Sequence, residues 1–280
     1  MKKISRRSFL AAAGLSVAAL ALTACGGSSA STASSVASSA AASSEAASTS
    51  AAAGELTTVE AGKLTMATNA TFPPYEMTTD AGDIEGIDVE TAQAIADKLG
   101  LELQIDDMDF DAALLSVQQG KADIVMAGVT VTDERKAVMD FSDSYATGIQ
   151  SIIVPEGSDI ASPDDLAGKK IGTQRGTTGY IYCSDDFGDE NVVAYDDGLT
   201  AVQALNNGQV DAVVIDNAPA KEFVAANPGL VILDTSYAEE DYAIGMAKGS
   251  SLEDAVNAAL KELKADGTLQ SIVDKYITAE

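Results

Sequence analysis

Arginine is the side chain best suited to holding a carboxylate, because its planar guanidinium donates two parallel hydrogen bonds to the two oxygens. The sequence has few arginines, and two of them, Arg6 and Arg7, lie close to its first residue. Arg135 follows an apolar segment within the sequence VTVTDERK, and ligands of α/β folds usually bind where strands end. Arg135 is therefore the best candidate for an anion-binding residue. The alternative is a solvated surface charge that balances Asp133 and Glu134.

Asp216 stands at the end of the apolar segment AVVID, which predicts a buried strand. A carboxylate there could hold a cationic group, because a charge removed from water needs an opposite partner and hydrogen bonds. Asp216 could instead cap the helix that follows the strand. A site for a molecule that carries both a carboxylate and an ammonium group would need a pair such as Arg135 and Asp216.

The composition excludes several classes of site and partner. The sequence has no histidine, which is the commonest general base and metal ligand, so we expect no catalytic residue, no metal and no cofactor. Of the two cysteines, Cys25 and Cys183, the second is interpreted as small apolar filler, and no disulfide framework is expected. The formal net charge of −26 disfavours nucleic acid and self-association, so we expect no nucleic-acid partner and a monomer.

Residues 1–24 are typical of a signal peptide, with lysines and arginines before an apolar stretch. The stretch ends in LTAC, which resembles a bacterial lipobox and implies cleavage before Cys25 and a diacylglycerol on its sulfur. An ordinary signal peptide with an incidental cysteine is the alternative. The segment SRRSFL from Ser5 to Leu10 resembles a twin-arginine export motif, although the general secretory route remains open.

The segment from Cys25 to about residue 58 is composed almost entirely of serine, alanine, threonine and glycine. It lacks apolar periodicity and cannot bury enough surface to offset chain entropy. We therefore predict that residues 25–58 form a disordered linker between the lipidated cysteine and a folded domain.

The remaining chain alternates between strand and helix patterns, which predicts two α/β lobes. Asp88 is a candidate N-cap for a helix that ends before Gly100. The expected strands are 63–68, 101–105, 124–127, 170–173, 192–195 and 211–215, and the expected helices are 88–99, 111–119, 178–183, 199–206 and two within 251–276. Segments 145–153 and 239–246 are the expected crossings between the lobes, and two crossings would form a hinge.

Several motifs in order resemble the amino-acid-binding proteins of polar amino-acid ABC importers, which are solute-binding proteins of family 3. They are ATNATFPPYE, GIDVE, MDFDAALLSVQQGKADIVMAGVTVTDERK, DFSDSYATG, DDLAGKKIGTQRGTTG, AVVID and ALKELKADGTL. The resemblance implies a two-lobed type II periplasmic-binding-protein (Venus flytrap) fold. It places lobe 1 at 59–147 plus 244–280 and lobe 2 at 148–243.

The resemblance also implies a function. The protein would bind a free amino acid between its lobes, close on it, and deliver it to a membrane permease with its ATPase. It would be extracytoplasmic, lipid-anchored at the outer face of the cell membrane, and not an enzyme.

By the same resemblance, Arg135 would grip the ligand's carboxylate, and Asp216 would hold its ammonium group. Thr130 and the loop at Thr177 and Thr178 would assist with the carboxylate, while the Gly128 carbonyl and the Thr130 hydroxyl would assist with the ammonium. Phe72 and Phe110 would sandwich the ligand, although both could simply be core residues.

Three positions bear on the ligand's side chain. Relatives that bind cationic amino acids often have an aspartate where this chain has Asn69. Ile215 and Gln174 also differ from the residues found in glutamine binders. These departures favour a neutral amino acid over a basic one.

Two other functions remain compatible with the sequence. Cyclohexadienyl dehydratases resemble these binding proteins and act on carboxylated rings, so a related enzyme is one alternative. A ligand sensor that uses a binding-type domain is the other.

Overall fold

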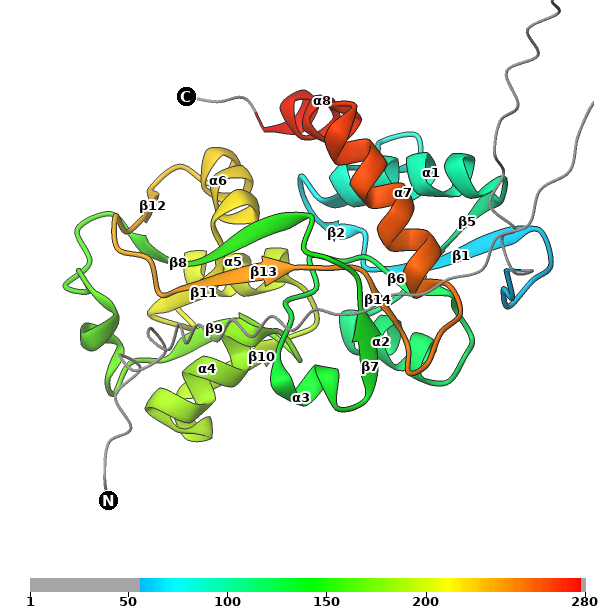
Figure 1. Cartoon of the computed structure of the whole chain (residues 1–280). Helices are drawn as coiled ribbons and strands as arrows, with labels where there is room; N and C mark the ends of the chain where they lie inside the picture. Colours follow the sequence, from blue (N-terminus) through cyan, green and yellow to red (C-terminus); the bar gives the residue numbers. More distant parts are fainter. Residues whose placement is uncertain (1–55, 278–280) are drawn as a thin grey trace, which may run out of the picture. The chain divides into compact units, whose positions relative to one another are not determined.

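The computed structural model describes residues 56–277 (Figure 1). The expected signal peptide, Cys25 and nearly all of the expected linker lie outside the described residues. Within residues 56–277, no helix is both long and apolar enough to cross a membrane.

Lobe 1 is built on a five-stranded sheet in the order β5-β1-β6-β14-β7. Strand β1 lies parallel to β5 and β6, whereas β14, which comes from late in the chain, lies antiparallel to β6 and β7. The strands are β1 (Lys63–Thr68), β5 (Glu102–Asp107), β6 (Ile124–Val125), β7 (Met139–Phe141) and β14 (Gly245–Ala247). A small sheet joins β2 (Thr71–Phe72), β3 (Glu76–Thr78) and β4 (Ile84–Glu85). The helices are α1 (Ile87–Leu99), α2 (Phe110–Gln118), α3 (Asp133–Lys136), α7 (Glu253–Ala265) and α8 (Thr268–Tyr276).

Lobe 2 is built on a second sheet in the order β10-β9-β11-β8-β12, with β13 also paired to β8. Its strands are β8 (Ala146–Pro155), β9 (Ile171–Gln174), β10 (Val192–Tyr195), β11 (Ala212–Asp216), β12 (Leu230–Ile232) and β13 (Ala238–Tyr242). Its helices are α4 (Thr178–Phe187), α5 (Gly198–Asn206) and α6 (Asn217–Ala226), with short 3-10 turns at Pro163–Leu166 and Asp189–Asn191. Two sheets flanked by helices confirm the predicted α/β fold class.

The chain passes between the two sheets on strands β8 and β13, which pair antiparallel from Ala146 opposite Tyr242 to Gln150 opposite Ala238 (Figure 1). Tyr242 is fully buried, and its ring fills the space above Gly148 on the opposite strand. A β-carbon at Gly148 would lie 2.6 Å from that ring. The packing at this crossing therefore depends on a glycine.

The start of α1 differs from the prediction. Gly86, rather than Asp88, is the N-cap residue, and Asp88 is the second residue of the helix, in its first turn, with its side chain fully buried. Gly86 has a φ of +138°, and a β-carbon there would lie 2.1 Å from the carbonyl oxygen of Tyr75. The chain can make this close approach only at a glycine, so the helix begins before Asp88. The Asp88 carboxylate is left free for contacts elsewhere.

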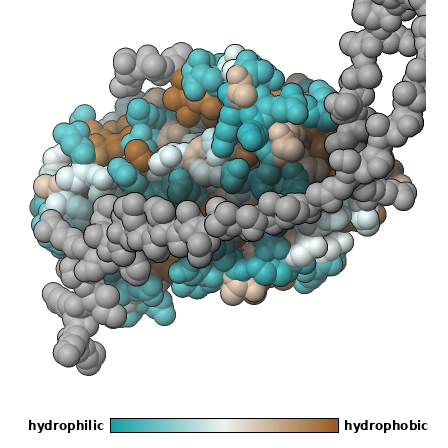
Figure 2. Space-filling view, in the orientation of Figure 1, coloured by the Kyte–Doolittle hydropathy of each residue, from teal (hydrophilic) through white to brown (hydrophobic). Residues whose placement is uncertain are grey.

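Apolar side chains from both sheets and their covering helices form the interior. Fully buried examples are Leu64, Met66, Ile95 and Ile153. Cys183 is also fully buried among apolar neighbours, and burial raises the pKa of its thiol to about 12. Hydrophilic residues cover much of the face seen in Figure 2. The packed interior is what holds each lobe as a rigid support for the groups between them.

We predict that Gly148→Ala lowers the free energy of unfolding by about 1–3 kcal/mol, because the added methyl group must displace the Tyr242 ring. The matched control is Thr147→Ala at the adjacent exposed position, which should change stability by less than about 0.5 kcal/mol. Urea denaturation followed by circular dichroism measures both. Equal stability of the two variants would contradict the tight packing at this crossing.

Candidate functional site

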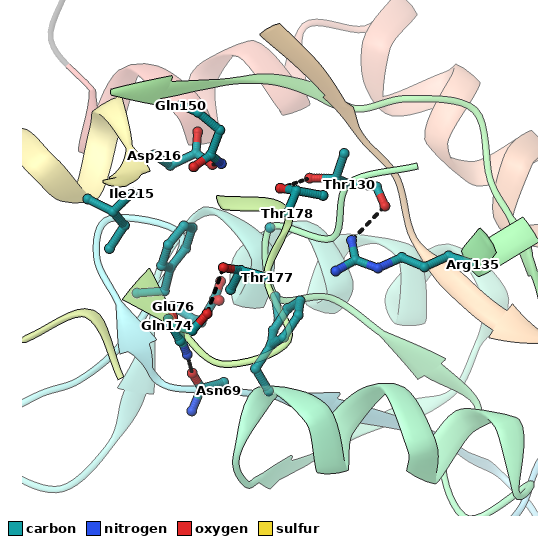
Figure 3. A pocket seen from close by; sticks show the side chains of 14 residues that line it. Asn69, Glu76, Thr130, Arg135, Gln150, Gln174, Thr177, Thr178, Ile215 and Asp216 are labelled. Atoms are coloured by element: carbon teal, nitrogen blue, oxygen red, sulfur yellow. Dashed lines mark hydrogen bonds between the residues drawn. The ribbon is translucent and has the colours of Figure 1, made fainter. Parts of the chain in front are cut away.

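A pocket lies between the two lobes, and both apolar and polar side chains line it, as they do in small-molecule sites (Figure 3). It is lined by every residue that the sequence singled out for the site, namely Asn69, Phe72, Phe110, Gly128, Thr130, Arg135, Thr177, Thr178 and Asp216. The other lining residues are Glu76, Ala127, Gln150, Gln174 and Ile215. The fold thus brings together residues that are far apart in the sequence and come from both sheets.

Arg135 is held rigidly at one wall of the pocket. It lies in α3, where the Thr132 side chain accepts its backbone N–H and so caps the helix. Its Nη1 donates to the carbonyl of Thr130 (2.8 Å), and its Nη2 donates to the carbonyl of Gly176 (3.1 Å) in lobe 2. A guanidinium has five N–H donors, so further donors remain for a ligand. Because Arg135 is only 9 % exposed, the interpretation as a solvated surface charge is wrong.

Asp216 lies at the end of β11 and is 4 % exposed. Its Oδ1 accepts the backbone N–H of Ile149 (2.8 Å), and its Oδ2 accepts from Nε2 of Gln150 (2.7 Å). Although Asp216 is the residue before α6, its side chain makes no capping hydrogen bond, so the helix-cap alternative is wrong. Burial, and then the charge of Glu240, raise the pKa of this carboxyl to about 6.

Glu240, which the sequence reasoning missed, joins both lobes and both crossing strands behind the pocket. Its Oε2 accepts from the hydroxyls of Thr130 (3.1 Å) and Thr178 (2.9 Å) and from Nε2 of Gln150 (3.0 Å). Burial alternates along β13, so that Glu240 and Tyr242 share the inward face. The sequence AEEDY has acids at three consecutive positions, so its pattern does not mark Glu240 as the inward-facing one.

At the other end of the pocket, Asn69 and Gln174 bridge the lobes, because Nε2 of Gln174 donates to Oδ1 of Asn69 (2.8 Å). Nδ2 of Asn69 donates to the carbonyl of Met108 (3.0 Å), which fixes the orientation of the amide. Glu76 lines the same end and is fully buried (Figure 3). This end is separate from the group formed by Arg135, Thr130 and Thr178.

Aromatic rings form the apolar walls. Phe72 and Phe110 both line the pocket, and each is buried and also packs within a core cluster. Their contact with a ligand remains a prediction. The guanidinium carbon of Arg135 lies 5.4 Å from the centre of the Phe110 ring. A β-carbon at Gly128 would come within 2.8 Å of Phe72, so this glycine lets the ring enter the pocket. The walls suit a ligand with apolar as well as charged parts.

The chemistry of the lining is that of an organic-ligand site. Among residues 56–277, no group of three or more histidine, cysteine, aspartate or glutamate side chains could hold a metal ion. The pocket instead offers a cation with unused donors, several fixed acceptors and aromatic faces. Such a set can hold a small molecule that carries charges of both signs.

Comparison with known proteins agrees with this description. Residues 64–279 match the family described as bacterial extracellular solute-binding proteins, family 3. The L-cystine-binding protein TcyJ of Escherichia coli is 34 % identical over 79 % of this chain and 85 % of its own length. The arginine-binding extracellular protein ArtP of Bacillus subtilis is 35 % identical over 78 % of this chain and 87 % of its own length.

A solved structure extends the comparison to the fold. The arginine-, lysine-, histidine-binding protein ArtJ of Geobacillus stearothermophilus superimposes with a TM-score of 0.75 at 35 % identity, over 78 % of this chain and 96 % of that one. The match therefore covers both sheets and the pocket between them. The fold, the pocket between its two sheets and these matches agree, and the chain belongs to the bacterial extracellular solute-binding proteins of family 3.

Proposed function

We propose that this protein is the ligand-binding component of an ABC importer and holds one free amino acid between its two lobes. The observation that carries the proposal is the pocket between the lobes, with a buried arginine at one wall and a buried aspartate at another. Within residues 56–277, Arg135 and Asp216 do not form an ion pair with each other. A zwitterion would supply a partner of opposite charge to each.

The carboxylate of the amino acid binds at Arg135. The remaining donors of its guanidinium can form a bidentate pair with two carboxylate oxygens. Helix α4 begins at Thr178 beside the same pocket, and its first-turn N–H groups and dipole also favour an anion. The Thr177 side chain caps this helix by accepting the N–H of Tyr180, so its role is to hold the turn.

The ammonium group binds at Asp216, with the hydroxyls of Thr130 and Thr178 as additional acceptors. Each hydroxyl has a single hydrogen, and each donates it to Glu240. Toward a ligand these hydroxyls can then only accept, which suits an ammonium and not a carboxylate. We therefore assign the hydroxyls of both Thr130 and Thr178 to the ammonium group, although the sequence indicated the carboxylate for Thr178. The backbone of their loops binds the carboxylate.

The role is binding and not catalysis. The relatives named above are binding proteins for cystine, for arginine, and for arginine, lysine and histidine. Each polar side chain of this pocket has a role in holding a ligand, and no observation favours a dehydratase or a sensor. Because the relatives bind different amino acids, their names do not select a side chain for this protein.

The family is extracytoplasmic, and we propose that a diacylglycerol on Cys25 anchors this member to the outer face of the cell membrane as a monomer. The serine- and alanine-rich segment after Cys25 would let the binding domain reach a permease and its ATPase in the same membrane.

Arg135→Ala and Asp216→Ala should each weaken amino-acid binding by roughly thirtyfold to several thousandfold, because each leaves one ligand charge buried without its partner. Arg135→Lys should also bind poorly, since an ammonium cannot replace the bidentate guanidinium. Isothermal titration calorimetry on the folded variants measures these affinities.

The control for these variants is Arg175→Ala, which removes an arginine that is largely exposed and outside the pocket. Its affinity should equal that of the native protein. Near-native affinity in a well-folded Arg135→Ala protein would contradict the site.

Glu240→Gln should weaken binding by about tenfold to a hundredfold, because it removes the charged acceptor that orients two threonine hydroxyls. The adjacent Glu239 lies exposed on the same strand, so Glu239→Gln removes the same charge without touching the site. Calorimetry on both variants, with unfolding curves to check the fold, isolates the effect. If the two glutamine variants bind equally well, Glu240 does not orient the site.

Cys25→Ala should release the protein from the membrane with its ligand affinity unchanged, because the anchor and the binding domain are separate parts of the chain. Cell fractionation and immunoblotting measure the distribution. A variant that remains in the membrane fraction would rule out Cys25 as the anchor.

A further inference from the structure

Asp88 of α1 is a buried acid whose hydrogen bonds lie outside its own helix. Its side chain is fully buried, yet it does not cap α1, whose N-cap is Gly86. Its Oδ2 accepts the N–H of Gly128 (3.0 Å) and the hydroxyl of Tyr145 (2.8 Å), which lie 40 and 57 residues further along the chain. Removing a carboxylate from water is costly unless hydrogen bonds replace the water. The role of Asp88 therefore lies with Gly128 and Tyr145.

The first donor, Gly128, begins a segment of chain that forms one side of the pocket. Gly128 and Thr130 both line the pocket, and the Thr130 carbonyl accepts from Nη1 of Arg135 (Figure 3). Gly128 has a φ of +56°, in the region that glycine enters freely, so its backbone has more conformational freedom than its neighbours. The hydrogen bond from its N–H to Asp88 restricts that freedom. We call residues 128–130 the pocket loop.

The second donor, Tyr145, stands at the start of a crossing between the lobes. It directly precedes β8, and its backbone N–H donates to the carbonyl of Tyr242 at the end of β13 (2.9 Å). The side chain is only 7 % exposed, and burial raises the pKa of its phenol, so the hydroxyl keeps its hydrogen for Asp88. One carboxylate oxygen thus joins the pocket loop to the point where both crossing strands meet lobe 1.

The charge of Asp88 strengthens both bonds. The titratable groups that face it are Glu76 of β3, Tyr75 and Tyr145. Burial raises the pKa of Asp88 to about 6, while the bonds from Gly128 and Tyr145 act to lower it. Burial, and then the charge of Asp88, raise the pKa of Glu76 well above its ordinary value. Glu76 is therefore the acid that stays protonated, and Asp88 is mostly ionised at pH 7. Hydrogen bonds to an ionised acceptor are roughly twice as strong as those between neutral groups.

We propose that Asp88 is a positioning residue of the binding site, which fastens the pocket loop at Gly128 to the start of crossing strand β8 at Tyr145. The inference rests on the proposed function and adds a residue that is not among those lining the pocket. Because the pocket loop also holds the Arg135 guanidinium through the Thr130 carbonyl, a displaced loop misplaces two groups that bind the ligand. The same side chain then sets the geometry of the pocket loop and of the crossing.

The first measurement needs no ligand. In proton–nitrogen NMR spectra of the purified protein freed of ligand, Asp88→Ala should move the Gly128 amide proton upfield and speed its exchange with solvent by at least about tenfold. Asp88→Asn keeps an oxygen acceptor of the same shape without the charge, so its Gly128 signal should lie between those of the native protein and Asp88→Ala. The matched control is Asp97→Ala at an exposed position of the same helix, which should leave the Gly128 amide unchanged.

The second measurement is affinity, by calorimetry with arginine, lysine, glutamine and cystine as probes. The probe that binds the native protein most tightly should bind Asp88→Ala roughly tenfold to a hundredfold more weakly, and Asp88→Asn no more than about fivefold more weakly. Tyr145→Phe removes only the second donor. It should keep the Gly128 amide protected, speed the exchange of the amide at position 145, and weaken binding about twofold to tenfold. Asp97→Ala should bind as the native protein does.

The outcomes separate a positioning role from a purely structural one. Variants of Asp88 that unfold more easily but keep the native Gly128 amide and the native affinity would overturn the proposal. If Asp88→Ala does not fold, a native Gly128 signal in Asp88→Asn has the same consequence. Native exchange and affinity in Tyr145→Phe would overturn the connection to the crossing. Binding of no probe by the native protein would overturn the proposed function, while the amide measurements would still decide whether Asp88 holds the pocket loop.

Discussion

The burial of charge between two lobes is the constraint on which the rest of the site depends. Four acidic side chains, Glu76, Asp88, Asp216 and Glu240, and one basic side chain, Arg135, lie in or beside one pocket with less than a tenth of their surface exposed. Ionised groups cannot remain there unless hydrogen bonds or opposite charges replace water. The protein supplies hydrogen bonds from backbone groups, threonine hydroxyls and the amide of Gln150, but few opposite charges. The charge that is missing must come from a ligand or from a proton.

The same constraint joins the site to the crossing strands β8 and β13. Gln150 on β8 donates to both Asp216 and Glu240, so one amide holds two acids that come from different strands. Glu240 on β13 accepts from a threonine of each lobe. Rotation of one lobe against the other must stretch or remake the bond between Thr130 and Glu240, because the other bonds named here lie within lobe 2. A ligand that bonds to both lobes therefore shifts the balance between their relative positions, in proportion to its preference for one of them.

Some of these residues could be predicted from the sequence, and others could not, because their roles depend on contacts between distant segments. Arg135 and Asp216 follow apolar strands, and a charged residue at the end of a buried strand is visible as a break in the pattern. The two-sheet fold and the family could also be predicted from the sequence, because the periodicity of each segment and the order of the motifs are read along the chain. Glu240 was missed because its partners lie up to 110 residues away, and its own segment looks like a polar strand. Asp88 was misread as a cap because the close approach at Gly86 moved the helix start.

A single position in the sequence does not define the charge of a whole pocket, and Glu76 illustrates this. Asn69 alone indicates a neutral ligand, because the position carries no charge. In the fold, however, Glu76 lines the same end of the pocket and is buried more deeply than Asn69. A buried carboxyl interacts with a cation more strongly than an exposed one, since water screens it less, but it also costs more to ionise.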